Sequence, residues 1–163
     1  MIIGVIGGGD CPPDMYALAQ EVGREIALQG HTLICGGMGG AMESACKGAK
    51  SAGGATIGLL PTGDIRDANA YVDYPIATDM GYARNVIIAR TTGAIVAVGG
   101  EYGTLSEIAH ALGFGVPVIG LTTWTLINGA GEPDTGIILS DNPTDAVRKA
   151  IAAAEKRPEF SPQ

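Results

Sequence analysis

Two ionisable residues in helix-like segments that are otherwise largely apolar are candidates for chemistry at a buried site. Arg84 is followed by Asn85 and then by the apolar residues 86–88. A guanidinium in a mostly buried helix needs a carboxylate or a ligand phosphate as its partner. Glu107 stands three residues after Thr104, a spacing that also fits a helix capping box. The pattern alone therefore leaves open whether Glu107 serves a ligand or caps a helix.

Three glycine-rich clusters could cradle an anion. They occupy residues 7–9, 36–40 and 99–103, and each follows a predicted strand and precedes a predicted helix. Backbone N–H groups in such loops, together with the positive ends of the following helices, bind phosphate. Tight turns between a strand and a helix also need glycine, so one cluster alone would carry little weight. Three clusters in equivalent positions favour a ligand that carries phosphate.

Other signatures of catalysis or metal binding are missing from the sequence. The first glycine cluster lacks the third glycine of the dinucleotide-binding fingerprint, and no P-loop or nucleophile elbow occurs. His31 and His110 lie far apart in the chain, so we interpret both as structural and expect no metal site. Cys11, Cys35 and Cys46 have no metal-ligand spacing and predict free thiols in a reducing compartment.

Alternating strands and helices must position these residues. The predicted strands are short apolar runs at residues 2–6, 32–35, 56–60, 95–98 and 118–121, with shorter ones near 71–74 and 137–139. The predicted helices cover residues 12–30, 41–52, 81–90, 105–112 and 144–155, the last capped by Asn142 or Thr144. This alternation predicts a three-layer α/β/α Rossmann-like sandwich with a mostly parallel sheet. Ligands of such sheets bind at the edge formed by the strand C-terminal ends.

Composition limits the class of protein. The 163 residues are 46% apolar and 17% charged, which excludes intrinsic disorder and fits one domain over residues 1–155. The polar residues 156–163 predict a flexible C-terminal tail. The net charge of −7 disfavours nucleic acid and anionic membranes as partners. With no long apolar run and no charged segment at the start, the sequence predicts a cytoplasmic protein.

Three segments together resemble the Rossmann-like superfamily of the LOG phosphoribohydrolases, proteins often mislabelled as lysine decarboxylases. The segments are residues 35–43, 80–85 and 99–107, and the resemblance extends over roughly residues 1–150. The chain is most similar to a short bacterial branch related to the molybdenum cofactor carrier proteins. The resemblance implies a homo-oligomer, either a dimer or a tetramer. The helix that carries Ile87 and Ile88 is the interface candidate, although a buried core face explains these residues equally well.

The resemblance also assigns roles at the site. In the phosphoribohydrolases the glycines and threonine of a PGGxGTxxE motif hold the nucleotide phosphate, and its glutamate corresponds to Glu107. The family's catalytic arginine corresponds to Arg84. Asp10 and Cys11, on the first loop, are weaker ligand candidates. The expected ligand site comprises Gly8, Gly9, Gly36, Gly37, Met38, Gly39, Arg84, Gly100, Gly103, Thr104 and Glu107.

Departures from the family pattern bear on which of two activities to expect. Glu101 stands in or beside the phosphate loop, where the motif has no carboxylate, and Asn85 replaces a basic residue. Both changes favour the carrier branch, whose members bind the pterin–phosphate molybdenum cofactor without turnover. We therefore expect a protein that binds a nucleotide-like or pterin ligand bearing phosphate, with no required cofactor of its own.

The alternative is a phosphoribohydrolase that cleaves the N-glycosidic bond of nucleoside 5′-monophosphates. Base and ribose 5-phosphate would be its products, with Arg84 and Glu107 as catalytic residues. The superfamily fold also occurs in a DNA-processing protein. Single-strand binding needs a basic groove with aromatic platforms, which a chain with one Trp, two Phe and a net charge of −7 does not suggest.

Overall fold

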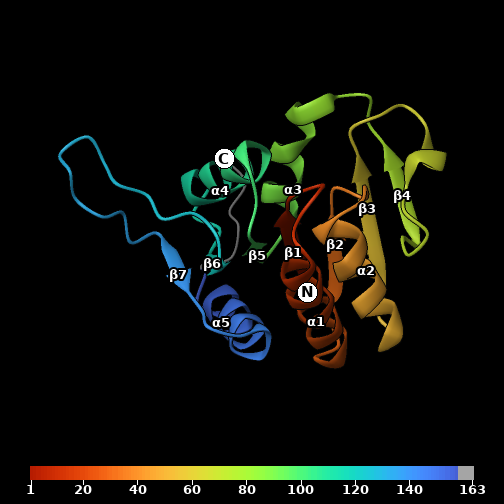
Figure 1. Ribbon diagram of the computed structural model, residues 1–163, viewed down its shortest axis with the longest axis horizontal. Coiled ribbons are helices and arrows are strands. Elements are labelled where there is room, and N and C mark those ends of the chain that lie inside the picture. Colours follow the sequence, from red (N-terminus) through yellow and green to blue (C-terminus); the bar gives the residue numbers. More distant parts are fainter. Residues whose placement is uncertain (158–163) are drawn as a thin grey trace.

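A seven-stranded sheet organises residues 1–157, the part of the chain that the computed structural model describes (Figure 1). All neighbouring strands pair in parallel, in the order β4-β3-β2-β1-β5-β6-β7. The strands are β1 (Ile2–Gly7), β2 (Thr32–Cys35), β3 (Thr56–Leu60), β4 (Tyr74–Ala77), β5 (Ala94–Val98), β6 (Val118–Leu121) and β7 (Ile137–Leu139).

Helices cover both faces of the sheet, which confirms the predicted three-layer sandwich. One core cluster joins the sheet to α1 (Pro13–Leu28), α2 (Ala41–Ser51) and α5 (Pro143–Glu155). A second cluster joins the opposite face to α3 (Asn85–Thr91) and α4 (Tyr102–Gly113). The central strand β5 is buried throughout: Val96 packs into the first cluster, and Ile95 packs into the second. A strand buried on both faces reads as a continuous apolar run because neighbouring side chains point to opposite layers.

The order in which successive strands are added to the sheet reverses between β4 and β5. Strands β1 to β4 follow one another toward one edge, and β5 then returns to pair with the other side of β1. The loops that follow β1 and β5 therefore diverge to opposite faces. Such a switch point opens a crevice at the strand C-terminal ends, where open parallel sheets bind their ligands. The first and third glycine clusters begin at this crevice.

One predicted strand lies three residues too early. Strand β4 starts at Tyr74, which pairs with Ile57, and not at residue 71. Residues 71–73 serve the start of β3 in another way. The Thr56 hydroxyl donates to the Tyr71 carbonyl at 2.7 Å, and the Asp73 carboxylate accepts the Thr56 N–H at 2.9 Å. These side-chain bonds hold the segment against β3 before the regular ladder begins.

Two predicted helices begin differently in the structure. The segment predicted as one helix over 81–90 is a 3₁₀ turn, η2 (Gly81–Arg84), followed by α3. Helix α4 begins at Tyr102, three residues before the predicted start. Asn142 caps α5, since its side chain accepts the Asp145 N–H at 2.9 Å.

The structure bears on the predicted C-terminal tail and on the predicted interface residues. Arg157 donates hydrogen bonds to the carbonyls of Thr92 and Phe114, both at 3.3 Å, and the rest of the predicted tail lies outside the described residues. Ile88 is fully buried in the core, whereas Ile87 is 36% exposed. Of that proposed interface pair, only Ile87 is accessible on the chain by itself. Among residues 1–157 no helix is long and apolar enough to cross a bilayer.

Candidate functional site

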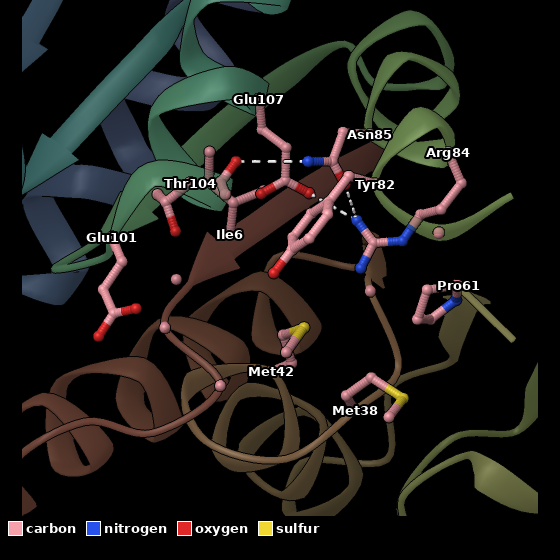
Figure 2. Close-up of a pocket in the computed structure, with 16 residues that line it drawn as sticks. Ile6, Met38, Met42, Pro61, Tyr82, Arg84, Asn85, Glu101, Thr104 and Glu107 are labelled. Atoms are coloured by element: carbon pink, nitrogen blue, oxygen red, sulfur yellow. Dashed lines mark hydrogen bonds and ion pairs between the residues drawn. The ribbon is translucent and has the colours of Figure 1, made fainter.

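A cavity of about 410 Å³ opens at the strand C-terminal edge, between the loops that follow β1, β2, β3 and β5 (Figure 2). It lies at the switch point described above. Its walls come from both helical layers, because α2 contributes from one face of the sheet and η2, α3 and α4 from the other. The lining residues are Ile6, Gly7, Gly8, Gly9, Gly36, Met38, Met42, Pro61, Gly81, Tyr82, Arg84, Asn85, Glu101, Gly103, Thr104 and Glu107.

Arg84 and Glu107 form a buried ion pair in this cavity. Arg84 Nη1 lies 3.1 Å from Glu107 Oε1, and the two side chains are only 9% and 8% exposed. Arg84 ends the 3₁₀ turn η2, and Glu107 projects from the second turn of α4. Two elements remote in sequence thus bring together the two residues predicted to act as a pair. A buried guanidinium finds the carboxylate partner that its apolar neighbours require.

The capping interpretation of Glu107 is wrong. The residue that caps α4 is Glu101, which makes no side-chain cap bond, and Thr104 already lies within the helix. A capping box needs the threonine at the cap position, where its hydroxyl can accept an N–H from the first turn. Because α4 starts three residues earlier than expected, the Thr104–Glu107 spacing instead places both side chains on the wall of the cavity.

Asn85 links the Arg84 guanidinium to the start of α4 through hydrogen bonds. Its Oδ1 accepts a hydrogen bond from Arg84 Nη1, and its Nδ2 donates to Ser106 Oγ at 2.8 Å and to the Gly103 carbonyl at 3.3 Å. Ser106 Oγ donates to the same carbonyl at 2.7 Å. Asn85 is 2% exposed, so each of these bonds satisfies a group that water does not reach. The residue that departs from the family pattern therefore positions the arginine.

The rest of the Arg84 guanidinium has fewer partners. Its Nε is buried and has no hydrogen-bond partner. Its Nη2 lies against the backbone of Gly36, where an added Cβ would press into the guanidinium and come within 2.7 Å of Met42 Sδ. Only glycine allows this approach. A buried charged donor without an acceptor is costly and calls for an explanation.

Burial changes the acidity of Glu107. Loss of hydration raises the pKa of this carboxyl to about 7, although the charge and hydrogen bond of Arg84 favour the ionised form. Desolvation therefore outweighs the ion pair. A carboxyl group that titrates near neutral pH can accept or donate a proton under physiological conditions.

The glycine loops differ in their ability to bind an anion. At the start of α1, Pro12 and Pro13 have no N–H groups, and the Met15 N–H already bonds to the Pro12 carbonyl. The third loop is better suited, because Gly103 and Thr104 line the cavity in the first turn of α4, where helical N–H groups are free. Glu101 stands beside this turn, across the cavity from Arg84 in Figure 2.

An apolar wall completes the cavity. Met38, Met42 and Pro61 lie along one side, and Tyr82 extends over the cavity from η2 (Figure 2). The Tyr82 side chain is close to Gly103, whose added Cβ would meet Cε1 of the ring at 3.4 Å. Tyr82 is 82% exposed, so most of its side chain is open to solvent or a ligand. Thioether and aromatic groups in this arrangement suit a planar ring.

Eight of the eleven expected site residues line the cavity, and three do not. Gly37 has φ +74° and packs on Leu60, while Gly100 has φ +107° and packs on Thr104. Gly39 also lies outside the lining. These glycines shape the loops. Asp10, Cys11, His31 and His110 lie outside the lining as well.

Sequence reasoning missed several lining residues. Pro61 directly follows a predicted strand, and Tyr82 stands two residues before Arg84, so their positions held a usable signal. Asn85 and Glu101 were recognised only as departures from the family pattern. The lining residues absent from the expected set are Ile6, Gly7, Met42, Pro61, Gly81, Tyr82, Asn85 and Glu101.

Comparisons with known sequences agree with the resemblance. A protein of Archaeoglobus fulgidus, described as uncharacterized, is 46% identical over 96% of this chain and 98% of its own length. The cytokinin riboside 5′-monophosphate phosphoribohydrolase of Mycobacterium tuberculosis is 30% identical over 83% of this chain and 84% of its own length.

Solved structures give a consistent picture. The molybdenum cofactor binding protein of Rippkaea orientalis is 33% identical with a TM-score of 0.83, covering 95% of this chain and 97% of its own. The molybdenum cofactor carrier protein of Chlamydomonas reinhardtii is 35% identical with a TM-score of 0.82, covering 95% and 99%. DNA processing protein A of Streptococcus pneumoniae, at 17% identity and a TM-score of 0.69 over 90% of this chain and 60% of its own, shares the fold alone.

The SLOG cluster4 family model matches residues 1–147, nearly the whole described chain. Together with the relatives above, this match confirms the resemblance to the LOG-like superfamily, and the chain belongs to the SLOG cluster4 family.

Proposed function

We propose that this protein binds a phosphate-bearing pterin or nucleotide-like ligand in the cavity around Arg84, as a carrier without chemical turnover. The proposal rests on the burial and incomplete hydrogen bonding of the Arg84 guanidinium. It is more than nine-tenths buried, its Nη1 is held by Glu107 and Asn85, and its Nε has no partner. A ligand oxygen on the Nε side would complete its hydrogen bonding.

The remaining walls match the two other parts of such a ligand. A planar ring would lie between the Met38 and Met42 thioethers and the Tyr82 ring. The phosphate would accept N–H groups from Gly103 and Thr104 in the first turn of α4, where the helix dipole favours negative charge. Molybdenum cofactor, a pterin with a phosphate, is the specific ligand that the carrier-like relatives suggest.

Two residues favour a carrier over a hydrolase. Glu101 puts a carboxylate beside the proposed phosphate turn, where the phosphoribohydrolase motif has none, so the chain departs from the hydrolases at this loop. Asn85 supplies no positive charge and uses its amide to hold Arg84 in place. The cavity therefore contains one cation and two carboxyl groups, Glu101 and Glu107.

A phosphoribohydrolase is the second candidate, and Glu107 is the observation that favours it. Its pKa of about 7 allows this carboxylate to stabilise an oxocarbenium-like ribosyl transition state and to accept the proton of the attacking water. Water would add to the anomeric carbon while the N-glycosidic bond breaks, giving free base and ribose 5-phosphate. Arg84 would hold Glu107 and the substrate in the relative positions that the reaction needs.

One experiment with two readouts separates the candidates. Purified protein is tested for retention of molybdenum cofactor released from a donor enzyme, and separately for release of adenine from adenosine 5′-monophosphate. A carrier retains the cofactor, loses it in Arg84→Ala and releases no adenine. A hydrolase releases adenine, and Glu107→Gln stops this release while the circular dichroism spectrum stays the same. Failure of both readouts would contradict the proposal.

A further inference from the structure

We propose that Cys35 and Cys46 form an oxidisable dithiol beneath the cavity, and that closing it to a disulfide weakens ligand binding. The first part, a modification site, stands independently of the proposed function. The second part, regulation of the cavity, rests on it.

The two sulfurs are already in contact. Cys35 ends β2, Cys46 lies in the middle of α2, and their Sγ atoms are 3.5 Å apart. Both thiols are free and fully buried. A disulfide bond is about 2.05 Å long, so the sulfurs must approach by about 1.5 Å. This approach requires rotation of the two side chains, a shift of α2 toward β2, or both.

The surroundings make Cys35 the attacking thiol. The hydrogen bond with Cys46 holds the pKa of Cys35 below its usual value, and the Gly37 N–H, which donates to Cys35 Sγ at 3.3 Å, acts in the same direction. The positive charge of Arg84 adds to this effect, while burial opposes it. The same hydrogen bond, together with burial, raises the pKa of Cys46. Within the pair, the Gly37 N–H and the Arg84 charge favour the thiolate at Cys35.

Hydrogen peroxide is the class of oxidant that fits this buried pair, because it is scarcely larger than water. The Cys35 thiolate attacks one peroxide oxygen and the O–O bond breaks, which gives a sulfenic acid and, after uptake of a proton, one water. Cys46 then attacks the Cys35 sulfur, the S–O bond breaks, and the hydroxyl leaves as a second water with the Cys46 proton. The two thiols lose two electrons in total, and the peroxide gains them.

Closing the disulfide would disturb the cavity directly. Cys35 is bonded to Gly36, the residue on which the Arg84 guanidinium rests, and Met42 lines the cavity one helical turn before Cys46. Gly36, Arg84 and Met42 are tightly packed, since even a methyl group on Gly36 would clash with both side chains. Pulling α2 toward β2 therefore changes the position of Met42, Arg84 or both.

Peptide mass spectrometry tests the dithiol without any ligand. Reduced protein is treated with hydrogen peroxide, alkylated and digested with trypsin, which cuts after Arg24 and Lys47. The resulting peptide 25–47 contains both Cys35 and Cys46, and Cys11 lies in peptide 1–24. We expect peptide 25–47 to be unalkylated and lighter by two hydrogen atoms, and to recover on reduction. The Cys11→Ser variant should give the same result. Alkylation at both cysteines, or a cross-link to peptide 1–24, would overturn the proposal.

Ligand retention tests the regulatory part. Reduced, oxidised and re-reduced wild type are compared with Cys35→Ala, which lacks the attacking thiol, using molybdenum cofactor or adenosine 5′-monophosphate, whichever the reduced protein retains. We expect affinity to fall at least tenfold on oxidation of the wild type, to return on reduction, and to be unaffected by peroxide in Cys35→Ala. Unchanged affinity in protein shown to contain the disulfide overturns the regulatory part. If reduced protein retains neither ligand, the proposed function fails, and the peptide measurement still decides the dithiol.

Discussion

Arg84 Nη1 and Glu107 Oε1 meet at 3.1 Å across a cavity, with both side chains more than nine-tenths buried. The pair joins a 3₁₀ turn to the second turn of α4, and it lies where the sheet reverses its strand order. An ion pair in this position contributes little net stability, because desolvation of both charges offsets their attraction. Its presence at the cavity is better explained by ligand binding.

The stability of the fold should depend on pH through Glu107. Its pKa is raised to about 7, above the value near 4.3 of an unfolded glutamate, so the folded chain binds more protons between these values. The free energy of unfolding of the wild type should therefore decrease as pH rises from 5 to 8, by on the order of 1–3 kcal/mol. Urea unfolding of Glu107→Gln should lack this decrease.

The control for this prediction is Glu132→Gln, which changes an exposed carboxylate outside the cavity lining. It should follow the pH dependence of the wild type. A Glu107→Gln variant whose stability falls with pH as steeply as that of the wild type would contradict the assignment of the elevated pKa.

Gly36→Ala should impair ligand binding more than it impairs folding. The added methyl group meets the Arg84 guanidinium and lies 2.7 Å from Met42 Sδ, so these two side chains must move. Gly36 is not among the glycines with a positive φ, so alanine adds no left-handed backbone strain there. We expect at least a tenfold loss of affinity, about 1.4 kcal/mol, in a calorimetric titration.

The matched control is Gly113→Ala at the end of α4, where an added Cβ meets nothing within 4 Å. This variant should bind ligand like the wild type and be as stable or more stable, since alanine favours helix. Equal affinities of the two variants would show that the Gly36–Arg84 contact does not matter for binding.

Asn85 offers a graded test of how the arginine is positioned. Asn85→Asp keeps an acceptor for Arg84 Nη1 but loses the donors to Ser106 and Gly103, and Asn85→Ala loses all three bonds. Unsatisfied buried groups cost about 1–3 kcal/mol, so thermal unfolding should rank wild type above Asp and Asp above Ala. Ligand affinity should follow the same order. An alanine variant that binds as tightly as the wild type would remove Asn85 from the site.

Glu101→Gln should increase affinity for a phosphate-bearing ligand. The substitution removes a negative charge beside the first turn of α4, and the exposed position limits the gain to several-fold. The gain should shrink as salt concentration rises, whereas the exposed Glu132→Gln variant should show no gain. Weaker binding by Glu101→Gln would instead mean that the carboxylate contacts the ligand.

The layers of the fold were predictable from the sequence because strands buried on both faces read as continuous apolar runs, as in Ala94–Val98. The need of Arg84 for a buried partner, either a carboxylate or a ligand phosphate, also followed from its apolar neighbours. The start of α4 did not, because Glu101 caps that helix without a side-chain hydrogen bond and gives no recognisable signal. The position of β4 was missed because Thr56 and Asp73 hold residues 71–73 by side-chain bonds that alternation cannot reveal.

The site residues show the same contrast between local sequence signals and tertiary contacts. Gly103, Thr104 and Glu107 were found because they follow a strand within a recognisable motif. Met42 and Tyr82 were not, because their place in the cavity depends on how α2 and η2 pack against the glycine loops. Tertiary contacts of this kind leave no periodic pattern in the sequence.

The most direct test of the carrier proposal is retention of molybdenum cofactor by wild type and Arg84→Ala, measured by gel filtration of the loaded proteins at pH 7. We expect the wild type to elute with bound cofactor, Arg84→Ala to elute without it while remaining folded, and neither to release adenine from adenosine 5′-monophosphate. Equal retention by both proteins, or retention by neither, would contradict the carrier function.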